Sequence, residues 1–353
     1  MTLDTIESQK WPEDGLERVE CCPICGEPDR KLLHAELTDR VFFCAPGKWS
    51  LNQCTSCGTG YLDPRPTSDT IALAYKHYFT HNEENDNPKS NFAYIKRNLR
   101  NGYLNYRYKA DIQPAWIIGR WIAVLWQRKR NQIDESVRHL PNSNNSGLLV
   151  DIGCGNGHFL NTAMELGWEA WGVDIDPKAV ETAQKTGARI LQGGFPKTGL
   201  PSEHFDIVTL SHVIEHVHDP IAALQEAFRV LKPGGQIWLA TPNMDSFGYA
   251  HFRENWFALD SPRHLVLFNP ISMKKALIKS GFINVKDKSC AINTSDTFKF
   301  SLRISRGQDP YHANGSNLPM TLQILSNLAN FIETIDPSQR ENLTITAQKP
   351  QSN

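Results

Sequence analysis

The 353-residue sequence predicts an α/β protein with a small metal-binding unit ahead of its main domain. Two observations support this prediction. From residue 148 onward, short apolar runs alternate with helical segments, which is typical of a parallel sheet covered by helices on both faces. Before that point, the sequence CxxCG occurs at residues 22–26 and again at residues 54–58, and such turns are typical of metal sites.

The composition is that of an ordinary globular protein. Hydrophobic residues make up 40% of the chain, and 37 Lys and Arg residues nearly balance 38 Asp and Glu residues. This balance gives the chain no overall attraction to nucleic acid or to an anionic membrane. The amino terminus has no basic region followed by an apolar one, so we expect no secretion signal and a cytoplasmic location.

Four units are expected along the chain. They are a disordered amino terminus, a zinc ribbon, a helical cap or linker and the α/β domain, over residues 1–18, 19–66, 67–140 and 141–350. Pro64 and Pro66 exclude a helix that continues out of the ribbon. An acidic break at residues 81–87 interrupts the helical unit, and the polar run at residues 141–147 is the clearest boundary.

An apolar run at residues 115–126 contains Arg120 and precedes a basic stretch, residues 127–130. Spanning a bilayer takes about 20 apolar residues, so this run is too short to span one. We expect a helix packed on the main domain. The alternative is an interfacial helix with Trp anchors and a basic flank, in weak contact with a membrane surface.

Within the main domain, the pattern predicts each strand and helix in turn. Asp176 is a suitable N-cap for one helix, with Pro177 at its first position. The strands are expected at residues 148–152, 169–174, 188–192, 205–211, 236–240, 282–287 and 341–349. The helices are expected at residues 158–166, 177–186, 220–231 and 271–280, with a further helical centre near 318–335 inside a polar insertion.

The cysteine spacing predicts a closed metal site. Each CxxC turn places two thiolates on one side of a metal, and two turns complete a tetrahedral site made by Cys22, Cys25, Cys54 and Cys57. Four protein ligands leave no position for a substrate, so the expected Zn²⁺ is structural and stabilises a small unit. The alternatives are four buried or redox-active cysteines, or Cys44 in place of one ligand.

A glycine-rich turn follows the first strand of the main domain. Residues 150–157 read VDIGCGNG, and the next strand ends at Asp174. Glycines let the backbone approach a ligand closely, and the following helix directs N–H groups at it. An acid at the end of the second strand can accept ribose hydroxyls. The acid ahead of the glycines, Asp151, disfavours a pyrophosphate and favours an ammonium or sulfonium ligand, both of which S-adenosylmethionine carries.

These segments resemble class I S-adenosylmethionine-dependent methyltransferases. The similar segments are VDIGCGNG, GVDID, FDIVTLSHVIEHVHDP and VLKPGG, at residues 150–157, 172–176, 205–220 and 230–235. The resemblance implies a Rossmann-like fold with a mostly parallel seven-stranded sheet and S-adenosylmethionine as cofactor. It places the cofactor contacts at Asp151, Gly153, Cys154, Gly155, Gly157, Asp174, Ile175, Phe195 and Ser211.

Further segments narrow the resemblance. CPICG, CTSCGTGYLDPRPT, LRNGYLNYRY, TPNMDSF and ENWFALDSPRHLVLF are similar to bacterial methyltransferases with an amino-terminal zinc ribbon. Such enzymes occur in surface-polysaccharide and natural-product pathways, and the methyltransferase part is similar to quinone-biosynthesis O-methyltransferases. The resemblance implies a small-molecule acceptor, such as a sugar, a glycan precursor or a natural-product intermediate.

Candidate catalytic residues follow the fourth strand. Methyl transfer aligns a nucleophile with the sulfonium and, where needed, removes its proton, a task that histidine performs near neutral pH. Spacing puts His212, Glu215 and His216 on one face of a helical turn. We expect His216 to be the general base and Glu215 its orienting partner. In the alternative, Glu215 and His216 only cap the local helix.

Two further questions about this region stay open. The quinone-biosynthesis relatives carry an ExxEH segment linked to a divalent metal, and His212 stands in its first acidic place here. The loop NWFALDSPRHL contributes His264, a further catalytic candidate, and Arg263, which binds a substrate anion or pairs with Asp260.

Other function classes remain as alternatives. They are a zinc-ribbon nucleic-acid-binding protein or RNA methyltransferase, and a scaffold that keeps the fold without activity. The ribbon is not rich in Lys and Arg, so no nucleic-acid partner is expected. The sequence leaves the oligomeric state open.

Overall fold

The computed structural model describes residues 10–75, 90–142, 147–288, 294–311 and 318–351. Its centre is a seven-stranded sheet with the order β12-β13-β10-β9-β6-β7-β8. The strands are β6 (Leu148–Ile152), β7 (Glu169–Asp174), β8 (Arg189–Gln192), β9 (Phe205–Ser211), β10 (Leu231–Pro242), β12 (Ile283–Asp287) and β13 (Asn342–Gln348). Neighbours from β8 to β10 are parallel, and β13 is antiparallel to both β10 and β12. The expected Rossmann-like, mostly parallel sheet is confirmed.

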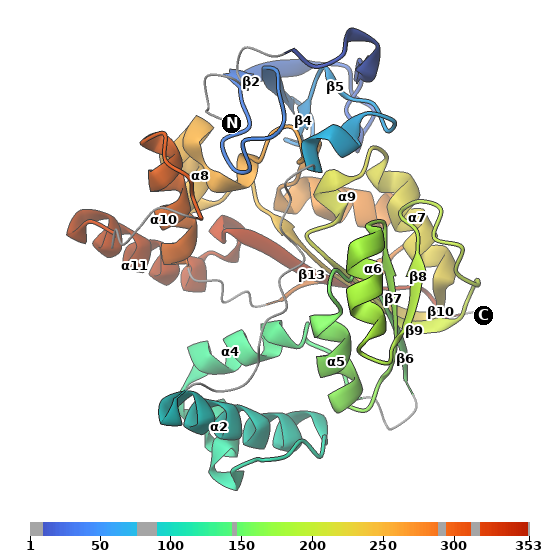
Figure 1. Ribbon diagram of the computed structural model, residues 1–353, viewed down its shortest axis with the longest axis vertical. Coiled ribbons are helices and arrows are strands. Elements are labelled where there is room, and N and C mark those ends of the chain that lie inside the picture. Colours follow the sequence, from blue (N-terminus) through green and yellow to red (C-terminus); the bar gives the residue numbers. More distant parts are fainter. Residues whose placement is uncertain (1–9, 76–89, 143–146, 289–293, 312–317, 352–353) are drawn as a thin grey trace.

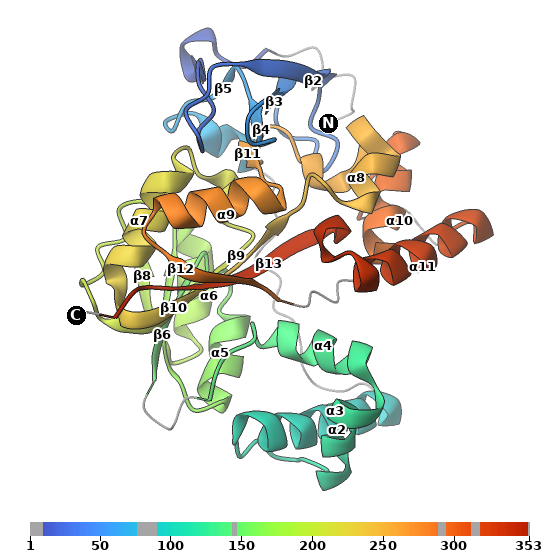
Figure 2. The ribbon, with the colours of Figure 1, turned by 180° about the vertical axis from the view of Figure 1, so that it is seen from behind.

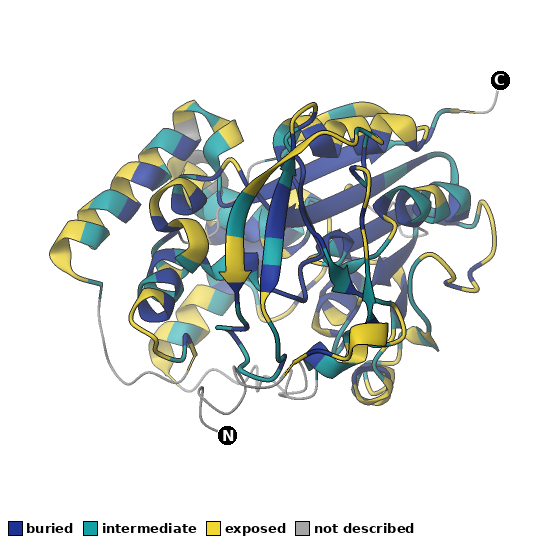
Figure 3. Ribbon diagram, turned by 90° about the horizontal axis from the view of Figure 1, so that it is seen from above, coloured by how far each residue is buried: buried dark blue, intermediate teal, exposed yellow. Residues whose placement is uncertain are grey.

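Helices cover both faces of this sheet (Figures 1 and 2). α5 (His158–Glu165) and α6 (Pro177–Gln184) lie on one face, and α7 (Pro220–Val230) and α9 (Pro270–Lys279) lie on the other. Asp176 caps α6, as the sequence predicts, by accepting a hydrogen bond from the backbone N–H of Lys178. In Figure 3 the central strands are mostly buried, whereas the surrounding helices alternate between buried and exposed residues.

The amino-terminal ribbon forms a second sheet, with the order β11-β4-β3-β2. Its strands are β2 (Arg30–Leu37), β3 (Trp49–Cys54), β4 (Gly60–Leu62) and β11 (Val266–Leu267). The last of these comes from the carboxyl-terminal half of the chain. Buried residues of the ribbon, such as Trp49 and Leu62, belong to the same hydrophobic cluster as Leu239 of the central sheet. The ribbon and the α/β unit therefore share one hydrophobic core. The domain boundary expected at residue 66 stays a prediction.

The expectation of disorder over residues 1–18 is wrong for residues 11–17. Trp11 is 4% exposed and its ring lies edge-on to Trp49, with centroids 5.2 Å apart. The strand β1 (Leu16–Glu17) pairs with β5 (Arg65–Pro66). The local sequence is polar, but one buried tryptophan and this pairing hold it against the ribbon. Residues 1–9 lie outside the described residues.

The segment before the main domain is largely helical where it is described. It contains α2 (Asn91–Tyr108), α3 (Ile122–Leu125) and α4 (Gln127–Ser136), at the end of the molecule opposite the ribbon (Figure 1). Tyr103 and Leu104 of α2 share a second hydrophobic cluster with Leu160 of α5. The acidic break at 81–87 and most of the linker at 141–147 lie outside the described residues.

The remaining elements are shorter or belong to the carboxyl-terminal insertion. α11 (Met320–Ile335) is the helix predicted near 318–335, whereas α8 (Phe247–Phe252) and α10 (Thr294–Ser305) were not predicted. Single 3-10 turns are η1 (Glu13–Gly15), η2 (Ile71–Tyr75), η3 (Ile117–Trp121), η4 (Ile214–His216), η5 (Arg253–Asn255), η6 (Phe257–Leu259) and η7 (Pro337–Gln339). None of the described helices is long and apolar enough to cross a membrane.

Candidate active site and cysteine cluster

The glycine turn links β6 to α5 in a conformation that requires glycine. Gly153, Gly155 and Gly157 have φ values of +70°, +55° and +81°. A Cβ on Gly153 would lie 2.5 Å from the side chain of Val213, so this turn directly abuts the segment that carries His212 and His216. At Gly155 nothing lies within 4 Å of the Cβ position, which leaves that side of the turn open. The turn thus provides a cradle that a ligand can approach closely.

Asp174 stands beside this turn at the end of β7. Its Oδ2 accepts a hydrogen bond of 2.8 Å from the backbone N–H of Gly155, and its Oδ1 accepts one of 2.9 Å from Asp176. A carboxylate offers about four acceptor positions, so two remain for other donors. The expected placement of an acid next to the glycines is present, and the free positions suit ribose hydroxyls.

Asp151 lies beneath the turn, with its side chain completely buried. Its Oδ1 accepts hydrogen bonds from Arg138 Nη1 and from Thr209 Oγ1. Burial raises the pKa of Asp151, while the charge of Arg138 acts in the opposite direction. Arg138 lies in the loop after α4, and no sequence motif marks it. Oδ2 of Asp151 has no hydrogen-bond partner among the described residues, so one buried acceptor stays available for a donor.

The other expected cofactor residues also lie at the carboxyl ends of parallel strands. Cys154 is buried within the turn, and Ser211 ends β9. Ile175 follows Asp174 and is 76% exposed, and its side chain lies 3.5 Å from the Cβ position of Gly194. Phe195 is the next residue after Gly194. The exposed Ile175 and the half-buried Phe195 therefore belong to two segments that meet after the ends of β7 and β8.

Glu215 is the most enclosed of the candidate catalytic residues. Its Oε1 accepts a hydrogen bond of 3.2 Å from His212 Nδ1, and its Oε2 accepts one of 3.0 Å from Thr241 Oγ1. Burial alone would raise the pKa of Glu215, but the hydrogen bond and charge of His212 outweigh it and lower this pKa to about 2. The contact with Glu215 in turn raises the pKa of His212 against the effect of burial.

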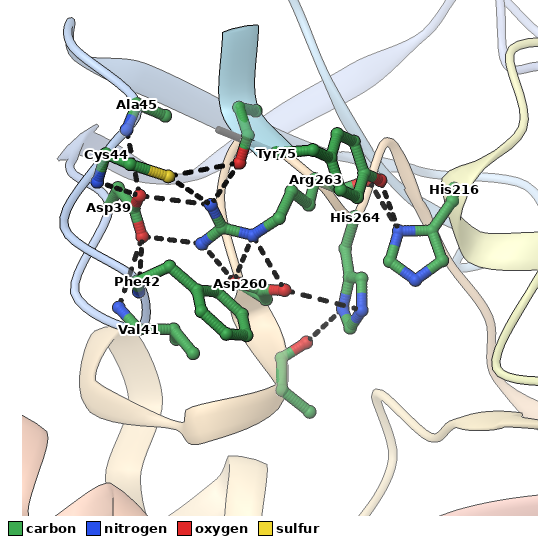
Figure 4. A network of polar contacts seen from close by, with 12 residues as sticks. Asp39, Val41, Phe42, Cys44, Ala45, Tyr75, His216, Asp260, Arg263 and His264 are labelled. Carbon is green, nitrogen blue, oxygen red and sulfur yellow. Dashed lines mark hydrogen bonds and ion pairs between the residues drawn. The ribbon is translucent and has the colours of Figure 1, made fainter. Parts of the chain in front are cut away.

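His216 has different partners from those expected (Figure 4). Its Nδ1 lies 3.0 Å from the backbone oxygen of Arg263 and 3.1 Å from the hydroxyl of Tyr75. Glu215, the expected partner, hydrogen-bonds His212 and Thr241 instead, although one polar atom each of Glu215, His216 and His264 lies within 4.8 Å of the others. A carbonyl oxygen can only accept, so Nδ1 of His216 donates a hydrogen bond to the backbone oxygen of Arg263. The neutral ring then has its lone pair on Nε2.

His264 lies against His216, with ring centroids 4.7 Å apart. Its Nδ1 donates a hydrogen bond of 2.8 Å to the backbone oxygen of Ala258, and its Nε2 lies 3.9 Å from Oδ2 of Asp260. Burial, together with the charge of His264, lowers the pKa of His216 to about 4. His216 is therefore neutral at physiological pH and presents an unprotonated nitrogen.

Arg263 is fully buried in an ion-pair network rather than open to a substrate. Its guanidinium bonds Asp260 at 2.9 Å and Asp39 at 3.0 Å, and donates a further bond of 2.9 Å to the backbone oxygen of Ala74. Of the two roles considered from the sequence, the ion pair with Asp260 is the one observed. The ribbon residue Asp39, which no sequence motif marks, completes the network (Figure 4).

The four expected metal ligands come together at the tips of the ribbon. Cys22 Sγ lies 3.6 Å from Cys57 Sγ, and Cys25 Sγ lies 3.4 Å from Cys54 Sγ. All four sulfur atoms lie within 4.8 Å of one another. Tetrahedral Zn²⁺ with bonds of about 2.3 Å separates its sulfur ligands by roughly 3.8 Å, so the donor set and spacing suit this metal. Cys44 lies apart and contacts the backbone oxygen of Ala74.

Comparison with known proteins adds a family match. The family model described as a methyltransferase domain matches residues 125–287. The ubiquinone biosynthesis O-methyltransferase of Nitrosospira multiformis is 29% identical over 108 residues, which cover 29% of this chain and 45% of that protein. The malonyl-[acyl-carrier protein] O-methyltransferase of Serratia marcescens is 29% identical over 145 residues, covering 40% and 56%. The chain thus spans about half the length of these curated relatives.

Solved structures of methyltransferases are also similar. A S-adenosylmethionine-dependent methyltransferase of Thermotoga maritima has 19% identity and a TM-score of 0.41, with coverage of 71% of this chain and 99% of the other. Phosphoethanolamine N-methyltransferase 2 of Haemonchus contortus, solved with S-adenosyl-L-methionine, has 18% identity and a TM-score of 0.43, with coverage of 83% and 63%.

Proposed function

We propose that this chain uses a class I S-adenosylmethionine-dependent methyltransferase domain to transfer the methyl group of this cofactor to a small molecule, with His216 as general base. One observation carries the proposal. The contact between Gly153 and Val213 joins the glycine turn to the segment of His216. Val213 stands three residues before His216, so this contact supports a position for the imidazole near the turn that would hold the methyl donor.

The residues of the turn suit the cofactor. The open side at Gly155 and the remaining acceptor positions of Asp174 suit the nucleoside, and the buried unpaired oxygen of Asp151 suits a donor on the methionine part. The cofactor supplies a methyl group on a positively charged sulfur. The protein's own task is to place the acceptor atom in line with that methyl group and to exclude water.

His216 supplies the proton acceptor in this proposal. As the acceptor atom forms its bond to the methyl carbon, the carbon–sulfur bond breaks and the acceptor's proton moves to Nε2 of His216. Arg263 holds Nδ1 through its backbone oxygen, so the ring presents Nε2 in a defined orientation. His264 lies against the ring and, by its charge, disfavours premature protonation of His216.

The acceptor class is proposed from the resemblance in the sequence. We propose a sugar, a glycan precursor or a natural-product intermediate, methylated at oxygen, nitrogen or carbon. The two curated relatives are named as O-methyltransferases, which supports oxygen as the first atom to test. We further propose that Zn²⁺ bound by Cys22, Cys25, Cys54 and Cys57 is structural, since four thiolates leave no open coordination position.

The experiment is a search for methyl acceptors followed by a substitution. Release of S-adenosylhomocysteine is measured with a panel of nucleotide sugars and other hydroxylated metabolites. With any acceptor found, His216→Ala is expected to lower kcat by about 10²- to 10⁴-fold, the usual contribution of a general base, without weakening S-adenosylhomocysteine binding. The matched control is His251→Ala, because His251 is an exposed histidine of α8. Unchanged turnover in His216→Ala would assign His216 a structural role.

A further inference from the structure

The helical segment at the end opposite the ribbon exposes many apolar side chains. Ile117 and Leu125 are 78% and 80% exposed, and Phe92, Trp121 and Trp126 are exposed as well. Large apolar side chains gathered on the surface of one segment are uncommon in a monomer without a partner and mark interaction sites. The proposed methyl transfer uses none of them.

The packing of this segment explains why these side chains face outward. A Cβ on Gly119 would lie 2.1 Å from the backbone oxygen of Leu99, and one on Gly102 would lie 1.8 Å from that of Trp116. η3 therefore rests on α2 through its glycine, backbone against backbone. Ile117 and Trp121 of η3 and Leu125 of α3 are left exposed, and we call these three side chains the apolar stripe.

Positive charges lie among the exposed rings. Lys96 Nζ is 4.3 Å from the ring centroid of Phe92, and the guanidinium carbon of Arg120 is 5.3 Å from that of Trp121. On α2, Arg97 lies in the same way over Tyr94, which also contacts the ring of Trp116. Phe92, Tyr94 and Trp121 thus each have a cationic side chain beside the ring.

The charge of the segment differs from that of the chain. Residues 91–130 contain nine Lys and Arg residues and one acidic residue, Asp111, whereas the whole chain has a net charge of −1. We call the exposed side chains of Phe92, Lys96, Ile117, Arg120, Trp121 and Leu125 the aromatic–basic surface. A surface that combines apolar anchors with concentrated positive charge is complementary to the headgroup region of an anionic membrane.

We propose that the aromatic–basic surface docks this protein on an anionic lipid bilayer, with the apolar stripe in the headgroup region and the cations at lipid phosphates. Ile117 and Leu125 gain from leaving water, which a polar nucleic-acid groove does not offer. A symmetric pairing with a second copy would place the same basic surface against itself, so charge repulsion disfavours it. The full protein therefore binds a surface of opposite charge.

The test is co-sedimentation of the full-length protein with vesicles. Wild type is expected to sediment with vesicles of phosphatidylcholine mixed with phosphatidylglycerol, not with phosphatidylcholine alone, and less at raised salt because salt screens the charges. Lys96→Glu with Arg120→Glu, and separately Ile117→Ser with Leu125→Ser, are expected to lower the partition coefficient about tenfold or more. The matched control replaces Ile271 and Ile278 of α9, which are 66% and 56% exposed, with serine and is expected to bind like wild type.

Three results would overturn the proposal. They are no sedimentation with the mixed vesicles at low salt, retention of vesicle binding in both double variants, and vesicle binding lost equally in the α9 control. Binding of S-adenosylhomocysteine by each variant reports on its folding, so a loss of lipid binding is separable from unfolding. Two further outcomes also count against the lipid assignment. One is that the protein binds RNA and not vesicles, and that this RNA binding is lost in Lys96→Glu with Arg120→Glu but kept in Ile117→Ser with Leu125→Ser. The other is concentration-dependent self-association lost in Ile117→Ser with Leu125→Ser.

Discussion

Asp39 and Arg263 form an ion pair in which neither side chain is exposed to solvent, although 224 positions separate them in the chain. Asp39 belongs to the ribbon, and the backbone oxygen of Arg263 bonds His216. Arg263 donates from all three of its nitrogen atoms within this network. The ribbon thereby holds the loop that orients the proposed base, which gives it a role in the site without any contact with substrate.

Replacing Asp39 with asparagine is expected to destabilise the protein strongly. Asp260 still pairs with Arg263 in this variant, but the charge-assisted hydrogen bonds between Arg263 and Asp39 are lost, and each contributes about 1.5 to 3 kcal/mol. Asp39 also accepts four backbone N–H bonds from residues 41–45, which an amide serves less well. The measurement is the free energy of unfolding from urea titration.

The control for this variant is Glu36→Gln, because Glu36 pairs with Lys48 on the exposed surface of the same ribbon. An exposed pair contributes about 0 to 1 kcal/mol, so this control is expected to unfold almost like wild type. Equal stability of Asp39→Asn and Glu36→Gln would contradict the structural role assigned to the network.

The pKa of His216 is expected to be about 4, well below the ordinary value of a histidine. Because the folded pKa is the lower one, the unfolded chain takes up this proton first as the pH falls. The contribution of neutral His216 to the free energy of unfolding is thus complete above the ordinary pKa, near 6.5, and is lost as the pH falls through about 4.

The measurement is an NMR titration of the histidine ring resonances, assigned with His216→Gln. His264→Gln removes the neighbouring charge and is expected to raise the pKa of His216 without reaching the ordinary value, since burial remains. A wild-type midpoint near 6.5 would show that His216 is neither buried nor influenced by His264.

One zinc ion per chain is expected in protein purified without chelator. Cys57→Ser removes a ligand from the cluster of four thiols, so the variant is expected to lose the zinc and to melt at a lower temperature. Cys21→Ser is the control, since Cys21 is exposed and lies next to a ligand in the sequence without joining the cluster. Elemental analysis of both variants gives the metal content. A metal-free wild-type protein, or equal zinc content in both variants, would contradict the assignment of a zinc site to the four cysteines.

The fold and the glycine turn were predictable because their signals are local. Alternating strands and helices, the spacing of Gly153, Gly155 and Gly157, and the acid at Asp174 each lie within a short stretch. The CxxCG turns are local as well, and pairing two of them needs only the usual four ligands of zinc. Tertiary contacts do not override these local features, so the folded chain keeps them.

The networks around the site were not predictable because tertiary contacts create them. From the sequence, Arg263 suits a substrate anion as well as an ion pair with Asp260. The ribbon residue Asp39, which also pairs with Arg263, is brought to it only by the tertiary fold. Arg138 reaches Asp151 from a loop with no motif of its own. β11 is two residues long and shows no periodicity, yet it completes the ribbon sheet. His216 is the last residue of the 3-10 turn η4, whereas its spacing from His212 and Glu215 predicted a helical turn that holds all three on one face.

Isothermal titration calorimetry with S-adenosylhomocysteine tests the central claim most directly, since it needs no knowledge of the acceptor. The full-length protein is expected to bind one equivalent. Asp174→Ala is expected to weaken this binding about tenfold or more, because a lost charge-assisted hydrogen bond contributes roughly 1.5 to 3 kcal/mol. Asp206→Asn disturbs the half-exposed pair with Lys232 and a hydrogen bond from the backbone N–H of Leu148, at the end of β6 away from the glycine turn. This variant is expected to bind like wild type. Absence of binding by the wild-type protein would contradict the account.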